Sequence, residues 1–172
     1  MNKLSTILLL TGALALSACN NPDRFGAGGA GGAGGAGGIS AGALGDPSDP
    51  NSIAYFNQTI GDTVRFAVDQ STLTPEAQTV LAQQAGWLNQ HPTYTAIIEG
   101  HADEQGTREY NIALGDRRAN AVKAYMISQG VGATRLQTVS YGKERPLAVC
   151  SDEACYAQNR RAVTVIGAGA GV

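Results

Sequence analysis

Two segments of the chain carry apolar residues at helical spacing. The first begins at Thr74, a good N-cap residue followed by proline. It ends before His91, because the residue that precedes Pro92 is pushed out of the α region. The second runs over residues 107–129 and is closed by Gly130. The two apolar faces consist of Ala77, Val80, Leu81, Gln84, Ala85 and Leu88, and of Leu114, Ala119, Val122 and Met126.

Short stretches rich in β-branched and other apolar residues predict the strands. The predicted strands are residues 53–58, 63–68, 94–99, 136–141 and 162–166. The first two flank Ile60-Gly61-Asp62, which predicts a hairpin. Because strands alternate with helices, we predict an α/β fold class, with both main helices on one face of a small mixed sheet in a single βαβαβ sandwich. The loops after Glu99 and around Arg145 then lie at the rim.

The first residues are typical of an export signal. Lys3 precedes an apolar run over residues 4–18, which is shorter than the roughly 20 residues of a membrane-spanning helix. Leu16-Ser17-Ala18-Cys19 resembles the bacterial lipobox, so we expect removal of residues 1–18 and a lipid on Cys19. The alternative is an ordinary secretory cleavage site. By similarity to sorted lipoproteins, Asn20 implies anchoring in the outer membrane, with the domain in the periplasm.

A glycine-rich segment separates this signal from the rest of the chain. Residues 26–38 read GAGGAGGAGGAGG and offer no side chain that builds a core. We therefore predict a flexible linker over residues 19–51, with an r.m.s. reach of ~30 Å, and a folded domain over residues 52–172.

Charge and cysteine content narrow the function classes. A net charge of −2 without a cluster of basic residues argues against a nucleic-acid partner. The chain has three cysteines, and lipid on Cys19 leaves Cys150 and Cys155 as an even pair in an exported protein. We predict a disulfide between them. Two free thiols, or half of a metal site, are the alternatives, but the sequence has no matching Cys or His pair elsewhere.

Candidate binding chemistry lies on either side of the start of the second helix. Asp103 belongs to a polar loop between two glycines, and Arg118 lies on the helix that follows. Asn111, Leu114 and Arg118 are spaced i, i+3 and i+7 and share a helix face toward that loop, whereas Arg117 faces solvent. An acid and a guanidinium together suit a zwitterionic ligand. The alternative is a structural ion pair between Asp103 and Arg118 that fastens the loop to the helix.

Residues 99–122, EGHADEQGTREYNIALGDRRANAV, resemble the signature of the OmpA-like peptidoglycan-binding domain family, and the similarity extends over about residues 66–165. The resemblance implies that Asp103 takes the amino group and Arg118 the carboxylate of meso-diaminopimelate in the peptidoglycan stem peptide. It also implies that Phe66 and Asp69 line the peptide site. Asn159-Arg160-Arg161 resembles the closing NRR element of the family. Arg160 and Arg161 either extend a positive rim or hydrogen-bond the backbone near the last strand.

The resemblance implies a binding protein rather than an enzyme, without a cofactor. It further implies an outer-membrane lipoprotein of the Tol system, with TolB and other Tol proteins as partners and a part in envelope constriction at division. The alternatives are a related lipoprotein outside the Tol system and a cell-wall hydrolase. His101 and Glu104 suggest metal or acid–base chemistry, but the only other histidine is His91 and no HExxH motif is present.

Overall fold

The computed structural model describes residues 44–168. The predicted signal peptide, Cys19 and the glycine-rich segment lie outside the described residues. The elements are, in chain order, α1 (Ile53–Tyr55), the π-helical turn η3 (Phe56–Gly61), β1 (Thr63–Arg65), α2 (Pro75–Gln90), β2 (Tyr94–His101), α3 (Arg108–Ser128), the 3₁₀ turn η4 (Ala133–Arg135), β3 (Leu136–Gly142), α4 (Glu153–Asn159) and β4 (Arg161–Ala168).

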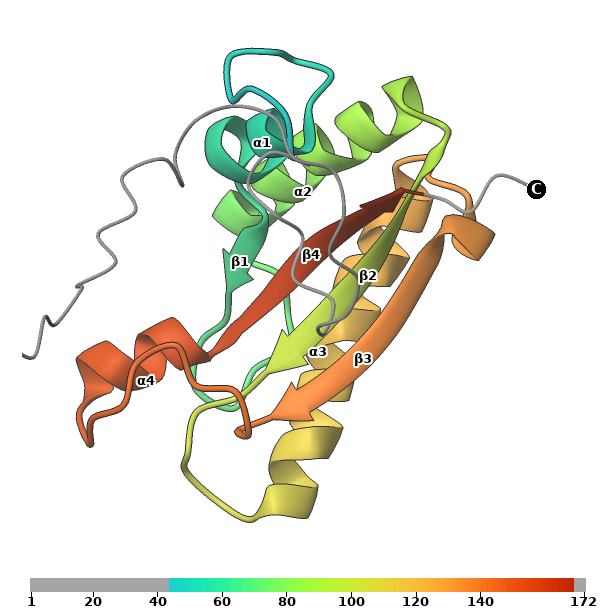
Figure 1. Ribbon diagram of the computed structural model, residues 1–172. Coiled ribbons are helices and arrows are strands. Elements are labelled where there is room, and N and C mark those ends of the chain that lie inside the picture. Colours follow the sequence, from blue (N-terminus) through green and yellow to red (C-terminus); the bar gives the residue numbers. More distant parts are fainter. Residues whose placement is uncertain (1–43, 169–172) are drawn as a thin grey trace, which may run out of the picture. The chain divides into compact units, whose positions relative to one another are not determined.

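The strands form a four-stranded mixed sheet in the order β1-β4-β2-β3. Strands β2 and β3 are parallel, and β4 runs antiparallel to its two neighbours, β1 and β2. Helices α2 and α3 lie against the same face of this sheet (Figure 1). The predicted fold class, α/β with helices on one face of a small mixed sheet, is therefore confirmed.

Local capping explains why both long helices begin where the sequence predicts. The hydroxyl oxygen of Thr74 accepts a hydrogen bond from the backbone N–H of Ala77 at 3.2 Å, and Thr107 accepts one from Tyr110 at 3.2 Å. Helix α3 ends one residue before Gln129, and Gly130 follows with a φ of 93°. Such a left-handed residue after a helix favours glycine, which has no Cβ to clash.

The strand predicted over residues 53–58, and with it the hairpin, is wrong. That segment is helical, with Ser52 as the N-cap of α1. Phe56 is fully buried, and its ring centre lies 5.1 Å from that of Trp87 on α2, so tertiary packing outweighs the β propensity of this run. Strand β1 pairs with β4 near the end of the chain, and the short helix α4 has no counterpart among the predicted elements.

The folded part begins before the predicted linker ends. Residues 44–51 form turns, and the indole N–H of Trp87 donates to the backbone carbonyl of Pro50 at 2.8 Å. The backbone N–H of Ala54 donates to the carbonyl of Leu44 at 2.8 Å. These contacts tie the end of the predicted linker to α1 and α2.

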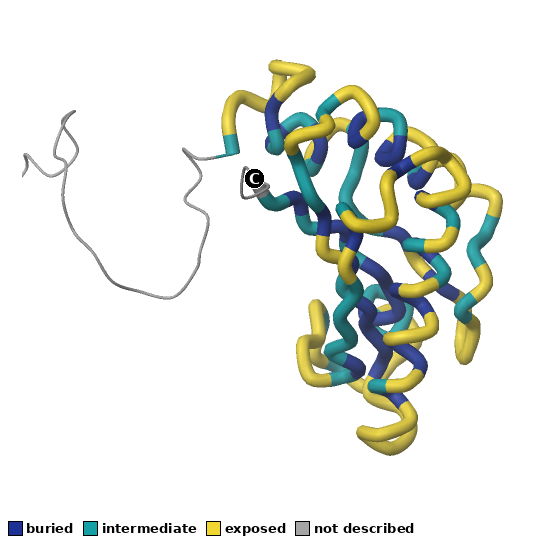
Figure 2. Tube along the Cα trace, turned by 90° about the vertical axis from the view of Figure 1, so that its right-hand side faces the viewer, coloured by how far each residue is buried: buried dark blue, intermediate teal, exposed yellow. Residues whose placement is uncertain are grey.

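Buried residues form a continuous band between the sheet and the two long helices (Figure 2). Helix α3 approaches β2 so closely that a Cβ added to Gly100 would collide with the backbone carbonyl of Gly115. This contact fixes the first half of α3 against the end of β2. Among residues 44–168, no helix combines the length and the apolar character that crossing a membrane requires.

Candidate functional site

A small cavity opens where β2 ends and α3 begins. Its volume is about 160 Å³, and it is lined by Val68, Asp69, Asp103, Gln105, Gly106, Tyr110, Leu114 and Arg118. Four predicted site residues therefore share one cavity, namely Asp69, Asp103, Leu114 and Arg118. A larger hollow of about 500 Å³ beside α2 has no charged side chain in its lining, so it offers no grip for a charged ligand.

Arg118 is fully buried and holds two segments of backbone together, the end of β2 and the loop after β1. Its Nε donates to the carbonyl of Gln70 at 2.8 Å, Nη1 to that of His101 at 2.8 Å, and Nη2 to that of Ala67 at 3.1 Å. The guanidinium carbon also lies 5.2 Å from the centre of the Phe66 ring. A guanidinium has five N–H groups, so each terminal nitrogen keeps one N–H beyond these three bonds.

Burial lowers the pKa of Arg118 to about 10, although the charge of Asp103 acts in the opposite direction. The guanidinium is thus protonated at neutral pH. A positively charged guanidinium in the lining of a cavity can bind a carboxylate.

The ion-pair partner of Asp103 is Arg160. Arg160 Nη1 donates to Asp103 Oδ2 at 3.1 Å, and both side chains are buried. Asp103 Oδ1 accepts a hydrogen bond from the backbone N–H of Gln105 at 3.2 Å. Among the described residues Asp103 forms no ion pair with Arg118, so the alternative of a structural Asp103–Arg118 pair is wrong. Asp103 instead retains lone pairs for a donor in the cavity, since a carboxylate accepts about four hydrogen bonds.

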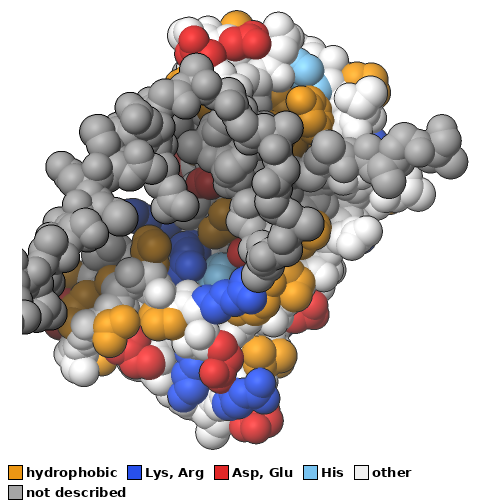
Figure 3. Space-filling view, in the orientation of Figure 1, with side chains coloured by type: hydrophobic (Ala, Val, Ile, Leu, Met, Phe, Trp, Pro, Cys, Tyr) orange, Lys and Arg blue, Asp and Glu red, His pale blue; other side chains and the backbone are white. Residues whose placement is uncertain are grey.

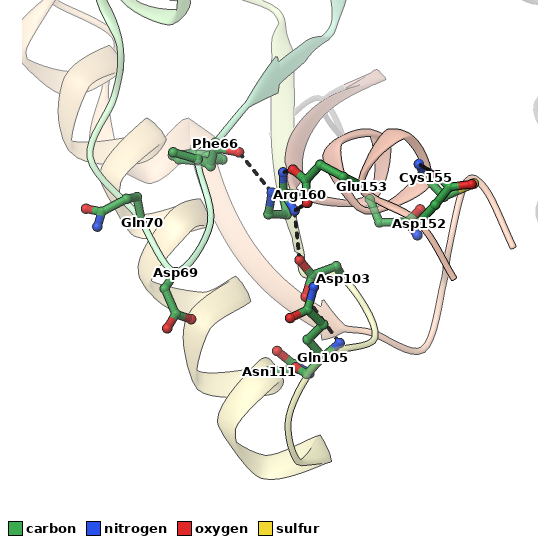
Figure 4. A network of polar contacts seen from close by, with 12 residues as sticks. Phe66, Asp69, Gln70, Asp103, Gln105, Asn111, Asp152, Glu153, Cys155 and Arg160 are labelled. Atoms are coloured by element: carbon green, nitrogen blue, oxygen red, sulfur yellow. Dashed lines mark hydrogen bonds and ion pairs between the residues drawn. The ribbon is translucent and has the colours of Figure 1, made fainter. Parts of the chain in front are cut away.

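Arg160 lies between two carboxylates (Figure 4). Besides Asp103 it contacts Glu153, through Nη2 to Oε1 and through Nη1 to Oε2 at 3.4 Å, while its Nε donates to the carbonyl of Phe66 at 3.4 Å. Burial alone lowers the pKa of Arg160, but the hydrogen bonds to Glu153 and Asp103 outweigh it and raise the pKa overall. The sequence reasoning missed Glu153. The sequence feature that could have indicated the helix carrying Glu153 is Asp152, the N-cap residue of α4.

Two predicted site residues stand behind the cavity rather than in its lining. Phe66 is buried beneath the guanidinium of Arg118. Asn111 is buried, and its Nδ2 donates to the carbonyl of Gln105 at 2.8 Å, which fixes the loop that carries Asp103. Both residues support the site from within.

Asn159 and Arg161 hydrogen-bond backbone groups near the last strand, which was one of the two predicted alternatives for Arg161. Asn159 Oδ1 accepts hydrogen bonds from the backbone N–H groups of Leu147 and Ala148 at 2.7 and 3.1 Å. Arg161 donates to the carbonyls of Asn159 and Arg145 at 3.4 and 3.2 Å. Of the two adjacent arginines, Arg160 alone contacts Asp103 in the described structure.

Asp69 and Tyr110 form the outer edge of the cavity. The Tyr110 hydroxyl donates to Asp69 Oδ1 at 2.7 Å, which raises the pKa of Tyr110. Asp69 has a φ of 58°, a left-handed conformation that aspartate tolerates better than most residues. Tyr110 was not predicted, although it lies four residues before Leu114 and eight before Arg118 and so shares their helix face.

The structure joins Cys150 and Cys155 in a disulfide, with Cα atoms 5.9 Å apart. The bridge closes the loop that leads into α4. Cys155 donates its backbone N–H to Asp152 Oδ1 at 3.1 Å, so the bridge and the N-cap hold the same turn.

Fold and site together define an α/β domain whose cavity presents acidic and basic groups side by side. Basic and acidic side chains also gather at the lower end of the face in Figure 3, where β2 and β3 end and α3 begins. Residues 65–161 match the OmpA family, and the chain belongs to that family. The resemblance seen in residues 99–122 is thereby confirmed.

The similar proteins carry one recurring name. The chain is 56% identical over 121 residues to the peptidoglycan-associated lipoprotein of Mesorhizobium japonicum, covering 70% of this chain and 72% of the relative. It is 43% identical over 164 residues to the peptidoglycan-associated lipoprotein of Haemophilus influenzae, covering 95% and 98%.

Solved structures agree with this assignment. The crystal structure of the peptidoglycan-associated lipoprotein from Burkholderia pseudomallei matches with a TM-score of 0.63 and 41% identity, covering 70% of this chain and 98% of that chain. The C-terminal domain of Helicobacter pylori MotB matches with a TM-score of 0.59 at 20% identity, covering 63% and 86%, which shows a common fold alone.

Proposed function

We propose that this chain is an outer-membrane lipoprotein whose domain binds peptidoglycan non-covalently through the diaminopimelate of the stem peptide. The observation that carries the proposal is the cavity of about 160 Å³ in which Asp103, Asp69 and Arg118 meet. The names of the relatives, which are peptidoglycan-associated lipoproteins, support the choice of ligand. The protein acts in this proposal as a binding domain and not as an enzyme.

The free end of the diaminopimelate side chain carries one ammonium and one carboxylate. In the proposed complex the ammonium donates to Asp103, whose lone pairs face the cavity, and Asp69 adds negative charge at the rim. The ligand carboxylate accepts hydrogen bonds from the two remaining N–H groups of Arg118. Each charge-assisted hydrogen bond contributes roughly 1.5–3 kcal/mol. Because Arg118 and Asp103 are already held by backbone and by Arg160, little side-chain entropy is lost on binding.

The anchor and the protein partners belong to the same proposal. Lipid on Cys19 would hold the chain at the outer membrane, since two or more acyl chains give stable anchoring. TolB is the proposed periplasmic partner, with a role in envelope constriction at division. The relatives' names support the lipid anchor, and the resemblance of residues 99–122 supports the Tol partner. A pull-down with TolB distinguishes it from a related lipoprotein outside the Tol system.

The testing experiment measures co-sedimentation of the unlipidated chain, from Asn20 onward, with diaminopimelate-type peptidoglycan. Asp103→Asn keeps the size of the side chain and removes the charge. We expect the wild-type chain to sediment and Asp103→Asn to lose most of its binding. Arg118→Ala is a poor test variant, because it would leave three backbone carbonyls without their donor.

Two controls make the result specific. Glu144→Gln removes an exposed carboxylate that pairs with the exposed Arg108, and it should sediment like the wild type. Lysine-type peptidoglycan lacks the side-chain carboxylate and should bind more weakly. If wild type and Asp103→Asn sediment equally, the proposed site is wrong. Release of muropeptides during incubation would favour the hydrolase instead.

A further inference from the structure

Glu153 lies outside the proposed cavity, yet it shares a buried arginine with the acid that lines it. The two terminal nitrogens of Arg160 contact Glu153, and Nη1 also contacts Asp103 Oδ2. The Arg160 side chain is 5% exposed, and that of Glu153 is 66% exposed. The arginine thus spans from the cavity wall to the surface of α4.

The net charge of Asp103, Arg160 and Glu153 bears on which ligands Asp103 can bind. Were Arg160 paired with Asp103 alone, the two charges would largely cancel and an incoming ammonium would meet a neutral pair. With Glu153 as a second partner, the trio of two carboxylates and one guanidinium keeps a net charge of −1. Glu153 thus offsets part of the positive charge of Arg160, so that Asp103 presents more negative charge to the cavity, where Asp69 and Arg118 also contribute their charges.

The disulfide keeps Glu153 in position. Glu153 is the first residue of α4, which has only seven residues and is too short to be a stable helix on its own. The bridge between Cys150 and Cys155 closes the loop around this first turn, and Asp152 caps the same turn through the N–H of Cys155. In Figure 4, Asp152, Glu153 and Cys155 lie on the side of Arg160 that is away from Asn111.

We infer that Glu153 is a specificity-determining residue that, held by the Cys150–Cys155 bridge, balances Arg160 so that Asp103 selects ligands carrying an ammonium group. The inference rests on the proposed function, since it assumes that diaminopimelate binds in the cavity. Glu153 acts through Arg160 and does not touch the ligand itself.

The test uses two tripeptides, L-Ala-γ-D-Glu-diaminopimelate and the same peptide with 2-aminopimelate as its third residue, which lacks only the side-chain ammonium. Calorimetric titration compares the wild-type chain from Asn20 onward with Glu153→Gln. We expect Glu153→Gln to weaken binding of the diaminopimelate peptide by roughly two- to fivefold, as for a partly exposed charge, and to leave binding of the 2-aminopimelate peptide unchanged or stronger. Glu144→Gln serves as the matched control and should change neither.

A double-variant cycle tests the role of the bridge. Cys150→Ser with Cys155→Ser should show the same ligand-dependent loss as Glu153→Gln, and combining all three changes should add little further loss. An equal loss for both peptides would mean that Glu153 only supports the fold, and no loss for either would mean that it does not act on Asp103; both results overturn the inference. If the wild-type chain binds neither peptide, the proposed function itself fails.

Discussion

Asp103 and Arg160 form a buried ion pair across 57 positions of sequence, with Nη1 and Oδ2 3.1 Å apart. The pair joins the loop after β2 to the start of β4, while Arg118 is committed to backbone carbonyls from β2 and from the segment after β1. The two arginines therefore have different tasks. Arg160 fixes the acid, and Arg118 fixes the chain around the cavity.

Arg118→Leu should destabilise the domain strongly. Three backbone carbonyls, among them that of the buried His101, would lose their donor and the cavity wall would lose its charge. Together these losses should lower the free energy of unfolding by roughly 3–5 kcal/mol. Urea unfolding followed by circular dichroism measures this change. The neighbouring Arg117 is exposed, so Arg117→Leu should change stability by no more than about 0.5 kcal/mol. Equal midpoints for the two variants would contradict the structural role of Arg118.

His101 should make the domain less stable in mild acid. It is buried, and burial, followed by the positive charges of Arg161 and Arg145, lowers its pKa to about 4. Glu99 Oε2 lies 3.6 Å from Nε2, but this carboxylate does not reverse the shift. Between pH 6.5 and 4 the unfolded chain therefore binds a proton that the folded chain excludes. Stability should fall as the pH falls through this window, by as much as roughly 3 kcal/mol.

The measurement is the free energy of unfolding at several pH values between 7 and 4. His101→Gln cannot be protonated, so its stability should vary less with pH in this window, whatever its absolute value. If His101→Gln keeps the wild-type slope, another group is responsible.

The elements that the sequence predicted correctly depend on local chemistry. Helices α2 and α3 begin at threonine caps and end before a proline and a glycine, and these signals act over a few residues. The error at residues 53–58 has the opposite origin. Their β-prone side chains are overruled by the burial of Phe56 against Trp87, a contact 31 positions along the chain that no local pattern reveals.

The candidate site divides in the same way. Asp103 and Arg118 could be predicted because a short motif carries both, and the structure places them around one cavity. The partner of Asp103 could not be predicted, because Arg160 is brought near it by the pairing of β4 with β2. Glu153 depends on that same pairing and on a seven-residue helix with a weak sequence signal.

Removal of the disulfide should lower stability moderately. In the chain-entropy model a loop as short as that between Cys150 and Cys155 contributes on the order of 2 kcal/mol. The double variant Cys150→Ser, Cys155→Ser should therefore unfold at a lower urea concentration than the oxidised wild type. Reduced wild-type protein should behave like the double variant. A variant as stable as the oxidised protein would show that the bridge adds no stability.

Gly115→Ala tests the close contact between α3 and the sheet. A Cβ at Gly115 would lie 2.8 Å from the carbonyl oxygen of Gly100 and would also collide with the Ser140 hydroxyl. Because the backbone of β2 cannot easily shift to relieve this clash, helix α3 must move away from β2. We expect a loss of roughly 1–3 kcal/mol in the free energy of unfolding, and weaker ligand binding because the start of α3 borders the cavity.

Gly86→Ala is the matched comparison, because Gly86 also lies inside a long helix, α2. A Cβ there meets no atom within 4 Å, so the substitution adds helix propensity without a clash and should stabilise the domain by roughly 0.5–1 kcal/mol. The two glycine variants should thus shift the unfolding midpoint in opposite directions. If Gly115→Ala also stabilised the domain, helix α3 would have to tolerate a wider spacing from the sheet than the contact between Gly115 and Gly100 implies.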